Sequence, residues 1–537
     1  MDRPEESGVA TVGRGQQAGG RGAVGQARTV LRLRGRDVQL YYLCECFTEA
    51  LIYLMVVFSP WAFGTTEDWS IGTMNAGGYA LGGLLAIKLG IRWLKGYRPP
   101  RWGARQEPSA DARSEPAGWT WVNPIAVLSA LAAAIVLYCW VSAWNARATL
   151  DAQSLVAVYR DNYIKWLPHS MDGNSSWQAF WNYLALACSF LAILDWLPGK
   201  TAAEERGESH TTDRRQGGSR SGHLFPARLR HLLWVLAING GLLGLEGIVQ
   251  RVSASPLLLF MVLPHIHVTA SMQFGPYAYR SNAAQYFNLL WPVCLGFWWT
   301  LHRGSRSRQA GHHCVLVLAL VMAACPIIAT SRLSAVVTAA MLVAAPLCLL
   351  AIQWLDGRRN KNKGQGRGAT LLLLLFSLAA LGLGLGVGWK TLKPRLAQIE
   401  MREGFGGRQE VYDLAQPMAK DYPVFGAGPG TFATVFPFYL KSKDTQAWAQ
   451  LHNDWLETRI TFGWVGCTLI GLAFATVILR WFGRGGIHGG RRFIVLVWLS
   501  LAGCLVEARW DFPFQVYSIE FLVLVLCAVA ANLTRKA

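Results

Sequence analysis

The chain has 537 residues, of which 52% are hydrophobic and only 15% are charged, and its formal net charge is +19. Soluble globular proteins have about a quarter of their residues charged, so this composition excludes an ordinary soluble enzyme. Most Lys and Arg residues lie in short segments between apolar stretches, the pattern that orients membrane proteins, which argues against a nucleic-acid partner. The 11 cysteines include no CxxC pair, so we expect no disulfide framework.

The apolar stretches are long enough for membrane helices, because about 20 residues cross the hydrocarbon core of a bilayer. They predict an all-α, polytopic membrane protein with about 12 transmembrane helices. The expected spans are residues 40–62, 71–94, 121–143, 177–197, 231–250, 283–302, 313–330, 333–354, 369–389, 459–481, 493–509 and 515–533.

Four segments follow from these spans. Residues 1–38 lack an apolar run and predict a disordered, basic cytoplasmic tail rather than a signal peptide. Residues 39–389 hold the first nine spans, and residues 459–537 hold the last three and a short cytoplasmic tail. The positive charges place both termini in the cytoplasm, so the long polar segment 390–458 is expected on the outer face with short helices of its own.

Three arginines lie at the outer edges of spans, namely Arg280, Arg332 and Arg408. Arg332 interrupts the long apolar run 313–354 and predicts a tight turn there, since a charge inside the bilayer is costly. A guanidinium group binds phosphate oxygens in bidentate fashion and keeps its charge, which suits a diphosphate at a membrane surface. The alternative for each arginine is a snorkelling side chain or the partner of a nearby carboxylate.

The polar segment ends in the hexapeptide 452–457, which begins with His452. An imidazole titrates near neutral pH and can take a proton from a hydroxyl, so His452 is a candidate general base. Asn453 follows it directly. Asp454 and Glu457 are three residues apart before an apolar span, and they also fit a helix-start capping box.

The same segment contains the closely spaced glycines Gly426, Gly428 and Gly430. Successive amides in such a loop can bind phosphate oxygens, but a turn between two helices explains the glycines equally well. No Lys-Ser/Thr pair follows, so a nucleotide P-loop is not expected.

Carboxylates also occur inside or beside the spans: Glu45, Glu49, Glu246, Glu507 and Asp511. They can relay protons, stay protonated or pair with arginines. Pairing with an arginine is the interpretation that we favour for Glu246 and Asp511. His265 and His267 are close in sequence without further ligands at a suitable spacing, so we expect no metal site and no cofactor.

The order of these motifs resembles the O-antigen ligase family of membrane glycosyltransferases, which includes polysaccharide polymerases and protein O-oligosaccharyltransferases. The likeness covers roughly residues 230–530. It is carried by residues 275–286 with Asn282, the Ser331-Arg332 turn, Arg408 with the glycines of 426–430, the stretch 452–456 followed by Gly463 and Gly466, and residues 511–513.

The resemblance implies an all-helical enzyme of the bacterial inner membrane, with its active site on the periplasmic face, in polysaccharide or lipopolysaccharide biosynthesis. It would transfer a glycan from undecaprenyl diphosphate to an acceptor hydroxyl, on a glycan or on the lipid A core. Attack at the anomeric carbon that displaces the lipid diphosphate would invert the configuration, and the lack of a metal-ligand cluster in the sequence predicts a metal-independent reaction. Arg280, Arg332 and Arg408 would then bind the diphosphate, and His452 would be the base. A polymerase of the same family is the main alternative. A flippase or transporter for lipid-linked glycans, using Glu45, Glu49 and Glu246, is the alternative from another class.

Overall fold

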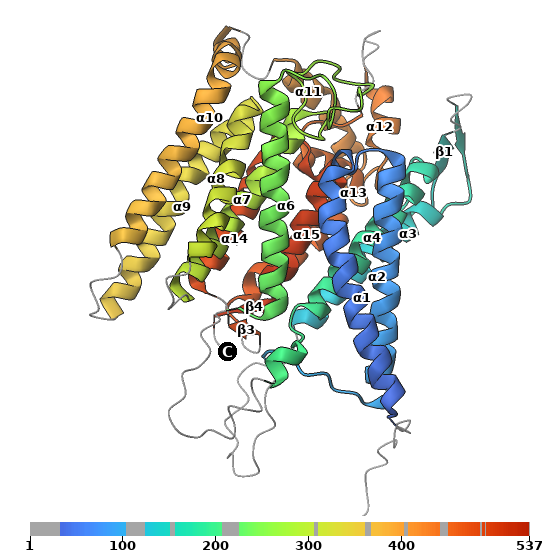
Figure 1. Cartoon of the computed structure of the whole chain (residues 1–537). Coiled ribbons are helices and arrows are strands. Elements are labelled where there is room, and N and C mark those ends of the chain that lie inside the picture. Colours follow the sequence, from blue (N-terminus) through green and yellow to red (C-terminus); the bar gives the residue numbers. More distant parts are fainter. Residues whose placement is uncertain are drawn as a thin grey trace, which may run out of the picture.

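The computed structural model describes residues 33–103, 124–150, 156–206, 225–304, 310–359, 367–401, 406–440, 449–483, 486–488 and 490–535. Within these ranges every expected span coincides with a helix (Figure 1). These helices are α1 (Gly35–Trp61), α2 (Asp68–Lys95), α3 (Pro124–Trp144), α4 (Gly173–Trp196), α6 (Ala227–Val252), α7 (Arg280–Gly304), α8 (His313–Ile328), α9 (Arg332–Arg359), α10 (Arg367–Met401), α13 (Asp454–Arg480), α14 (Arg491–Glu507) and α15 (Tyr517–Asn532).

Several helices have the properties of membrane spans. Among the described residues, seven are long and apolar enough to cross a bilayer: α1, α3, α4, α6, α9, α10 and α13. Helices α8 and α15 are apolar but shorter. Large apolar side chains point outward from the bundle, such as Leu54, Leu378 and Leu479, each more than 60% exposed. Lipid rather than water suits such surfaces, so the chain is an integral membrane protein.

Helix α7 lies at the centre of the bundle. All of its residues from 281 to 300 are buried, because they face neighbouring helices on every side. Trp291 and Trp298 are among the largest fully buried side chains of the described chain. This helix begins at Arg280, so the packing of the core fixes the position of one candidate site residue.

The described part of segment 390–458 forms short helices at the end of the bundle opposite the C-terminus (Figure 1). They are α11 (Gly406–Asp421), α12 (Phe432–Val435) and the 3-10 turn η3 (Phe436–Tyr439). Helix α11 is amphipathic, and its buried residues Val411, Ala415 and Met418 pack against Phe432 and Phe436. The resulting small core sits over the ends of the long helices.

Some boundaries differ from the prediction. Helix α10 continues to Met401 instead of ending at residue 389, and Leu392 on this extension is buried against Ile327 and Ala335. Helix α1 already begins at Gly35, inside the predicted tail, and residues 1–32 lie outside the described residues. Helical periodicity also gave no sign of two short strand pairs. These are β1 (Ala148–Leu150) with β2 (Ala157–Tyr159), and β3 (Ile487–His488) with β4 (Leu533–Thr534).

Glu45 of α1 belongs to a buried ion network. Lys88 Nζ lies 2.9 Å from Glu45 Oε1 and 3.3 Å from Asp195 Oδ2. Glu45 also pairs with Arg228. Because buried charges are stable only when they are paired, this network joins α1, α2, α4 and α6.

Candidate functional site

The centre of the candidate site is a histidine–aspartate pair. His452 Nδ1 lies 3.0 Å from Asp511 Oδ1, and the Asp511 carboxylate is buried while the imidazole is 19% exposed. An ionised carboxylate only accepts hydrogen bonds, so this contact makes Nδ1 the protonated nitrogen. Nε2 is then the nitrogen that can accept a proton from a substrate.

The backbone around His452 is held in an unusual conformation. His452 has φ +56°, in the left-handed region that non-glycine residues rarely adopt. Tyr412 on α11 donates a hydrogen bond of 2.6 Å to the His452 carbonyl. The His452 imidazole packs edge-on against the Phe512 ring. Strain of this kind persists only where the surroundings enforce it, and it marks functional positions.

The residues after His452 form hydrogen bonds that connect the start of α13 to the segments around Leu451 and Phe514. Asn453 caps α13, since its side chain accepts from Leu456 N at 3.1 Å. The Asp454 carboxylate accepts from Phe514 N at 2.7 Å, and the Glu457 carboxylate accepts from Leu451 N at 2.8 Å. The capping box expected from Asp454 and Glu457 is therefore wrong, and these two acids connect α13 to its flanking segments.

Tyr279 forms an aromatic wall beside this pair. It stacks on Phe512 at 5.7 Å between ring centroids, stacks on His267 at 5.2 Å, and meets His452 edge-on at 6.2 Å. Burial raises the pKa of Tyr279, and the charge of Asp511 adds to this effect while Arg408 opposes it. Tyr279 thus remains a neutral phenol beside the imidazole.

One of the three predicted arginines, Arg408, contacts Tyr279, and a second, Arg280, follows Tyr279 in the chain. Arg408 on α11 donates to the Tyr279 hydroxyl at 3.3 Å and to the carbonyl of Trp510. Arg280 follows Tyr279 directly and donates to Ser271 O at 2.6 Å. Arg408 and Arg280 are therefore both held by hydrogen bonds, and of the two only Arg408 bonds to the Tyr279 hydroxyl.

Arg332 reaches the same region through the start of α9. Its neighbour Ser331 lies 3.1 Å, oxygen to oxygen, from Ser281, which is the neighbour of Arg280. The first turns of α7 and α9 are thus in contact, and the Arg332 side chain is exposed. The tight turn predicted before Arg332 is present, with Thr330 at φ +60°.

The glycine loop has a structural role. Gly426, Gly428 and Gly430 all have positive φ. The amides of Ala427 and Gly428 donate to carbonyls of α13 at 2.8 and 3.1 Å, so they are not available to a phosphate. A Cβ on Gly426 would collide with the Thr461 backbone. The turn interpretation is supported, and the phosphate-binding alternative is not.

Asp511 and Glu246, the two carboxylates for which an arginine partner was expected, do not pair with an arginine in the described part of the chain. Asp511 does have a partner, but it is the His452 imidazole, which lies 3.0 Å away, and not an arginine. Neither oxygen of Glu246 finds a hydrogen-bond partner in the described part of the chain, so its expected arginine pair is not seen.

A buried polar layer lies beneath the arginines. Asn288 donates to Glu507 at 3.0 Å and accepts from Thr338 at 2.7 Å. Asn282 is buried at the start of α7, and its Oδ1 has no partner among the described residues.

Some site residues were not predicted from the sequence. Tyr279, His267, Tyr412 and Phe512 surround His452, and the signal for Tyr279 was its position directly before Arg280. Arg251, in the last turn of α6, donates to Gln273 O at 2.8 Å and to Ala329 O at 3.2 Å. Its place at a span edge is the same signal that singled out Arg280.

An apolar cavity of ≈ 440 Å³ lies next to the site, between α3, α4, α13 and α15. Its walls include Phe190, Phe462 and Leu524, and its lining also contains Asp454 and Trp455 at the start of α13. The cavity therefore begins two residues from His452 and is suited to a hydrocarbon chain.

Comparison with known proteins finds a family whose model matches part of the chain. The model of a family described as O-antigen ligase matches residues 315–471. This part of the chain is similar to the O-antigen ligase family. The O-antigen ligase match includes Arg332, Arg408 and His452, and it confirms the family predicted from the sequence. No curated protein and no solved structure matches the chain.

Proposed function

We propose that the protein is a membrane glycosyltransferase of the O-antigen ligase type, which moves a glycan from a polyprenyl (undecaprenyl) diphosphate to an acceptor hydroxyl. The observation that carries this proposal is the His452–Asp511 pair, 3.0 Å apart, next to the Tyr279–Arg408 contact. The O-antigen ligase family match over His452 and Arg408 supports it.

In the proposed reaction His452 Nε2 takes the proton of the acceptor hydroxyl. The acceptor oxygen attacks the anomeric carbon of the donor sugar, and the bond from that carbon to the diphosphate oxygen breaks with inversion. Asp511 stabilises the imidazolium that forms, as the aspartate does in hydrolase triads. General base catalysis of this kind contributes about 10²–10⁴-fold to a rate.

The arginines stabilise the charge that develops on the departing lipid diphosphate. Arg408 uses part of its donor set on Tyr279 and Trp510, and a guanidinium group has five N–H donors in all. Arg332 is exposed at the start of α9, and its neighbour Ser331 contacts Ser281, the neighbour of Arg280. Fixed guanidinium groups supply the positive charge for the leaving group, and we propose a metal-independent reaction.

The apolar cavity is suited to the polyprenyl chain of the donor. It lies between α3, α4, α13 and α15 and starts beside the loop that carries His452. A lipid chain held there would place its diphosphate near the arginines. Such placement reduces the entropy cost of bringing donor and acceptor together.

We further propose twelve membrane crossings in the bacterial inner membrane, with both termini cytoplasmic and segment 390–458 periplasmic. The lipid A core or another glycan is the proposed acceptor, and a polymerase would use a second lipid-linked glycan. The partners of Glu45 and Glu49 do not favour a transporter. Glu45 is paired with Lys88, and Glu49 accepts from Tyr53 at 3.1 Å.

A reconstituted transfer assay tests the function. The full-length protein, a polyprenyl-diphosphate glycan and a lipid-linked glycan acceptor are incubated in nanodiscs, and product formation is measured. His452→Ala is expected to lower kcat by about 10²-fold or more. His265→Ala, which changes an exposed histidine of an outer segment, is expected to keep the wild-type rate.

Equal rates for His452→Ala and wild type would contradict the proposal. In the same way, movement of the donor between leaflets without any transfer would identify a flippase instead.

A further inference from the structure

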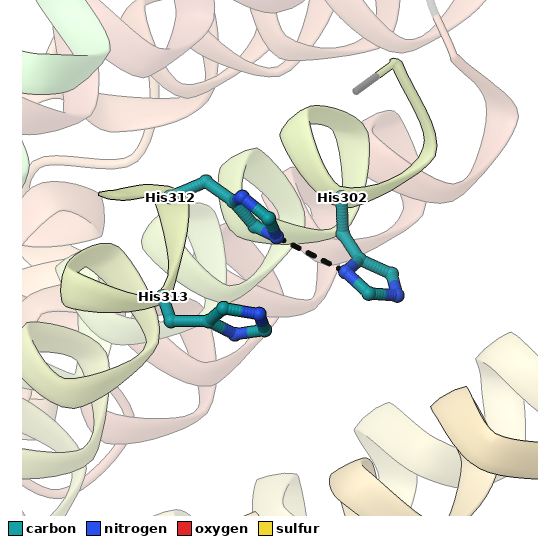
Figure 2. A group of neighbouring side chains, drawn as sticks. All are labelled: His302, His312 and His313. Carbon is teal, nitrogen blue, oxygen red and sulfur yellow. Dashed lines mark hydrogen bonds between the residues drawn. The ribbon is translucent and has the colours of Figure 1, made fainter. Parts of the chain in front are cut away.

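Three histidines meet at the end of the α7–α8 pair that lies away from the candidate active site. His302 is in the last turn of α7, His312 ends the 3-10 turn η2 (Ala310–His312), and His313 begins α8. One nitrogen of each ring lies within 4.8 Å of those of the other two. Figure 2 shows the rings of His302 and His312 turned toward each other, with His313 beside His312.

The nitrogen spacing is close to that of a metal site. His302 Nδ1 and His312 Nε2 are 3.1 Å apart. Two imidazole nitrogens bound at 2.0–2.1 Å to one tetrahedral Zn²⁺ lie about 3.3 Å apart. The third nitrogen, at up to 4.8 Å, needs a movement of at most about 1.5 Å to reach that spacing.

The contact between the His302 and His312 rings also indicates that at least one of them has a nitrogen lone pair, which a metal ion could bind. A hydrogen bond between two imidazoles needs a donating N–H on one ring and a lone pair on the other. At least one of His302 and His312 is therefore neutral in this arrangement, and a neutral imidazole nitrogen is the ligand that a metal binds.

The surroundings hold the rings in place but leave access from outside. His302 stacks on Trp298 at 5.3 Å, and His313 lies 6.3 Å from the same indole. Trp298 is fully buried in α7, so the ring that supports the histidines is rigid. All three histidines are half-buried, which leaves room for a water molecule as a fourth ligand.

We propose that His302, His312 and His313 bind a divalent transition-metal ion, with Zn²⁺ the best match to an all-imidazole site. Within the described residues this is the one group of three or more His, Cys, Asp or Glu side chains with such spacing. His265 and His267, the pair considered from the sequence, are not part of it.

The position of the cluster separates it from catalysis. At 1.5 Å per residue, His302 lies about 33 Å along α7 from Arg280. A metal bound there joins the last turn of α7 to the first turn of α8 and acts as a structural clamp on the core helix. The inference does not rest on the proposed glycosyl transfer.

Zinc binding by the full-length protein tests this inference. After removal of any affinity tag, the detergent-solubilised chain is titrated with Zn²⁺ in a calorimeter, and its metal content is measured after dialysis. Wild type is expected to retain about one Zn²⁺ per chain. His302→Ala and His312→Ala are each expected to weaken Zn²⁺ binding by at least about tenfold. Loss of a residue that only hydrogen-bonds to a metal ligand already weakens metal binding by about this factor.

His231→Ala is the matched control, because His231 is an exposed histidine on α6 outside the cluster. It is expected to bind Zn²⁺ as wild type does. Melting in EDTA separates binding from folding: a His302→Gln chain that melts as wild type does in EDTA, yet gains nothing from Zn²⁺, supports the site. No zinc retained by wild type, or equal affinity in wild type and the His302 variants, would overturn it.

Discussion

The imidazole of His452 and the carboxylate of Asp511 are joined by a 3.0 Å hydrogen bond across 59 positions of the sequence. His452 lies in the segment that matches the O-antigen ligase family, whereas Asp511 lies beyond it, in the turn between α14 and α15. Both backbones are tied together as well, since Asp454 N donates to Ala508 O at 2.8 Å. The pair is therefore a fixed element of the fold.

Replacement of Asp511 tests its role in orienting His452. In Asp511→Asn the amide can donate to Nδ1, which moves the proton of the imidazole to Nε2 and removes the base. We expect kcat to fall by about 10²–10⁴-fold with a small change in the KM for the acceptor. Steady-state kinetics in nanodiscs measure both. Asp413→Asn, at an exposed position of α11, serves as the control and is expected to be neutral.

Arg332→Lys keeps the positive charge but loses the planar fork of the guanidinium group. If Arg332 binds the diphosphate in bidentate fashion, the KM for the lipid donor is expected to rise about tenfold or more. Binding of radiolabelled donor measures this, with Arg160→Lys, an exposed arginine after β2, as the control. Wild-type donor affinity in Arg332→Lys would remove Arg332 from the site.

The pH dependence of stability tests the environment of His267. Burial lowers the pKa of His267, and the charge of His452 lowers it further. As pH falls below about 6.5, the unfolded chain takes up a proton that the folded chain does not, so the folded state loses stability in this window. His267→Gln is expected to flatten the decline of Tm below pH 6.5. Parallel Tm curves for variant and wild type would contradict the lowered pKa.

Gly463→Ala tests how the glycine loop holds the site. Gly463 has φ +60° and ψ −167° at a break in α13, and a Cβ there would collide with the Val424 carbonyl. We expect a loss of about 1–3 kcal/mol from backbone strain alone, together with lower activity. Thermal unfolding measures the loss.

Gly471→Ala is the matched control on the same helix, since a Cβ at Gly471 meets nothing within 4 Å. It is expected to be neutral or to stabilise the protein by up to about 1 kcal/mol. Equal Tm values for the two variants would show that the break in α13 is not a constrained position.

The helices were predictable because lipid-facing and core positions are both apolar, so the spans stand out by composition alone. The extension of α10 to Met401 was not, because it depends on the packing of Leu392 against Ile327 on another helix. The residue that caps the N-terminus of α13 is likewise Asn453 and not Asp454, because the Asp454 carboxylate accepts a hydrogen bond from Phe514 N in the loop before α15.

The residue types of the candidate site were proposed from the sequence, but the contacts between those residues were not. Span-edge position singled out Arg280, Arg332 and Arg408 as candidates, since a charge at such a place has an evident cost. The structure instead puts Arg408 on the short helix α11 and not at the edge of a span. The partner of His452 could not be predicted, because several acids lie near the ends of spans and only the tertiary fold selects Asp511. The His302 cluster was missed for the same reason, because its members come from two helices.

A double-mutant cycle on transfer activity tests the central claim most directly. The rates of His452→Ala, Asp511→Asn and the double variant are compared with wild type in the reconstituted assay. If Asp511 acts through the imidazole, the double variant is expected to be no slower than His452→Ala. Losses that simply add in the double variant, or transfer that survives His452→Ala, would contradict a catalytic His452–Asp511 pair.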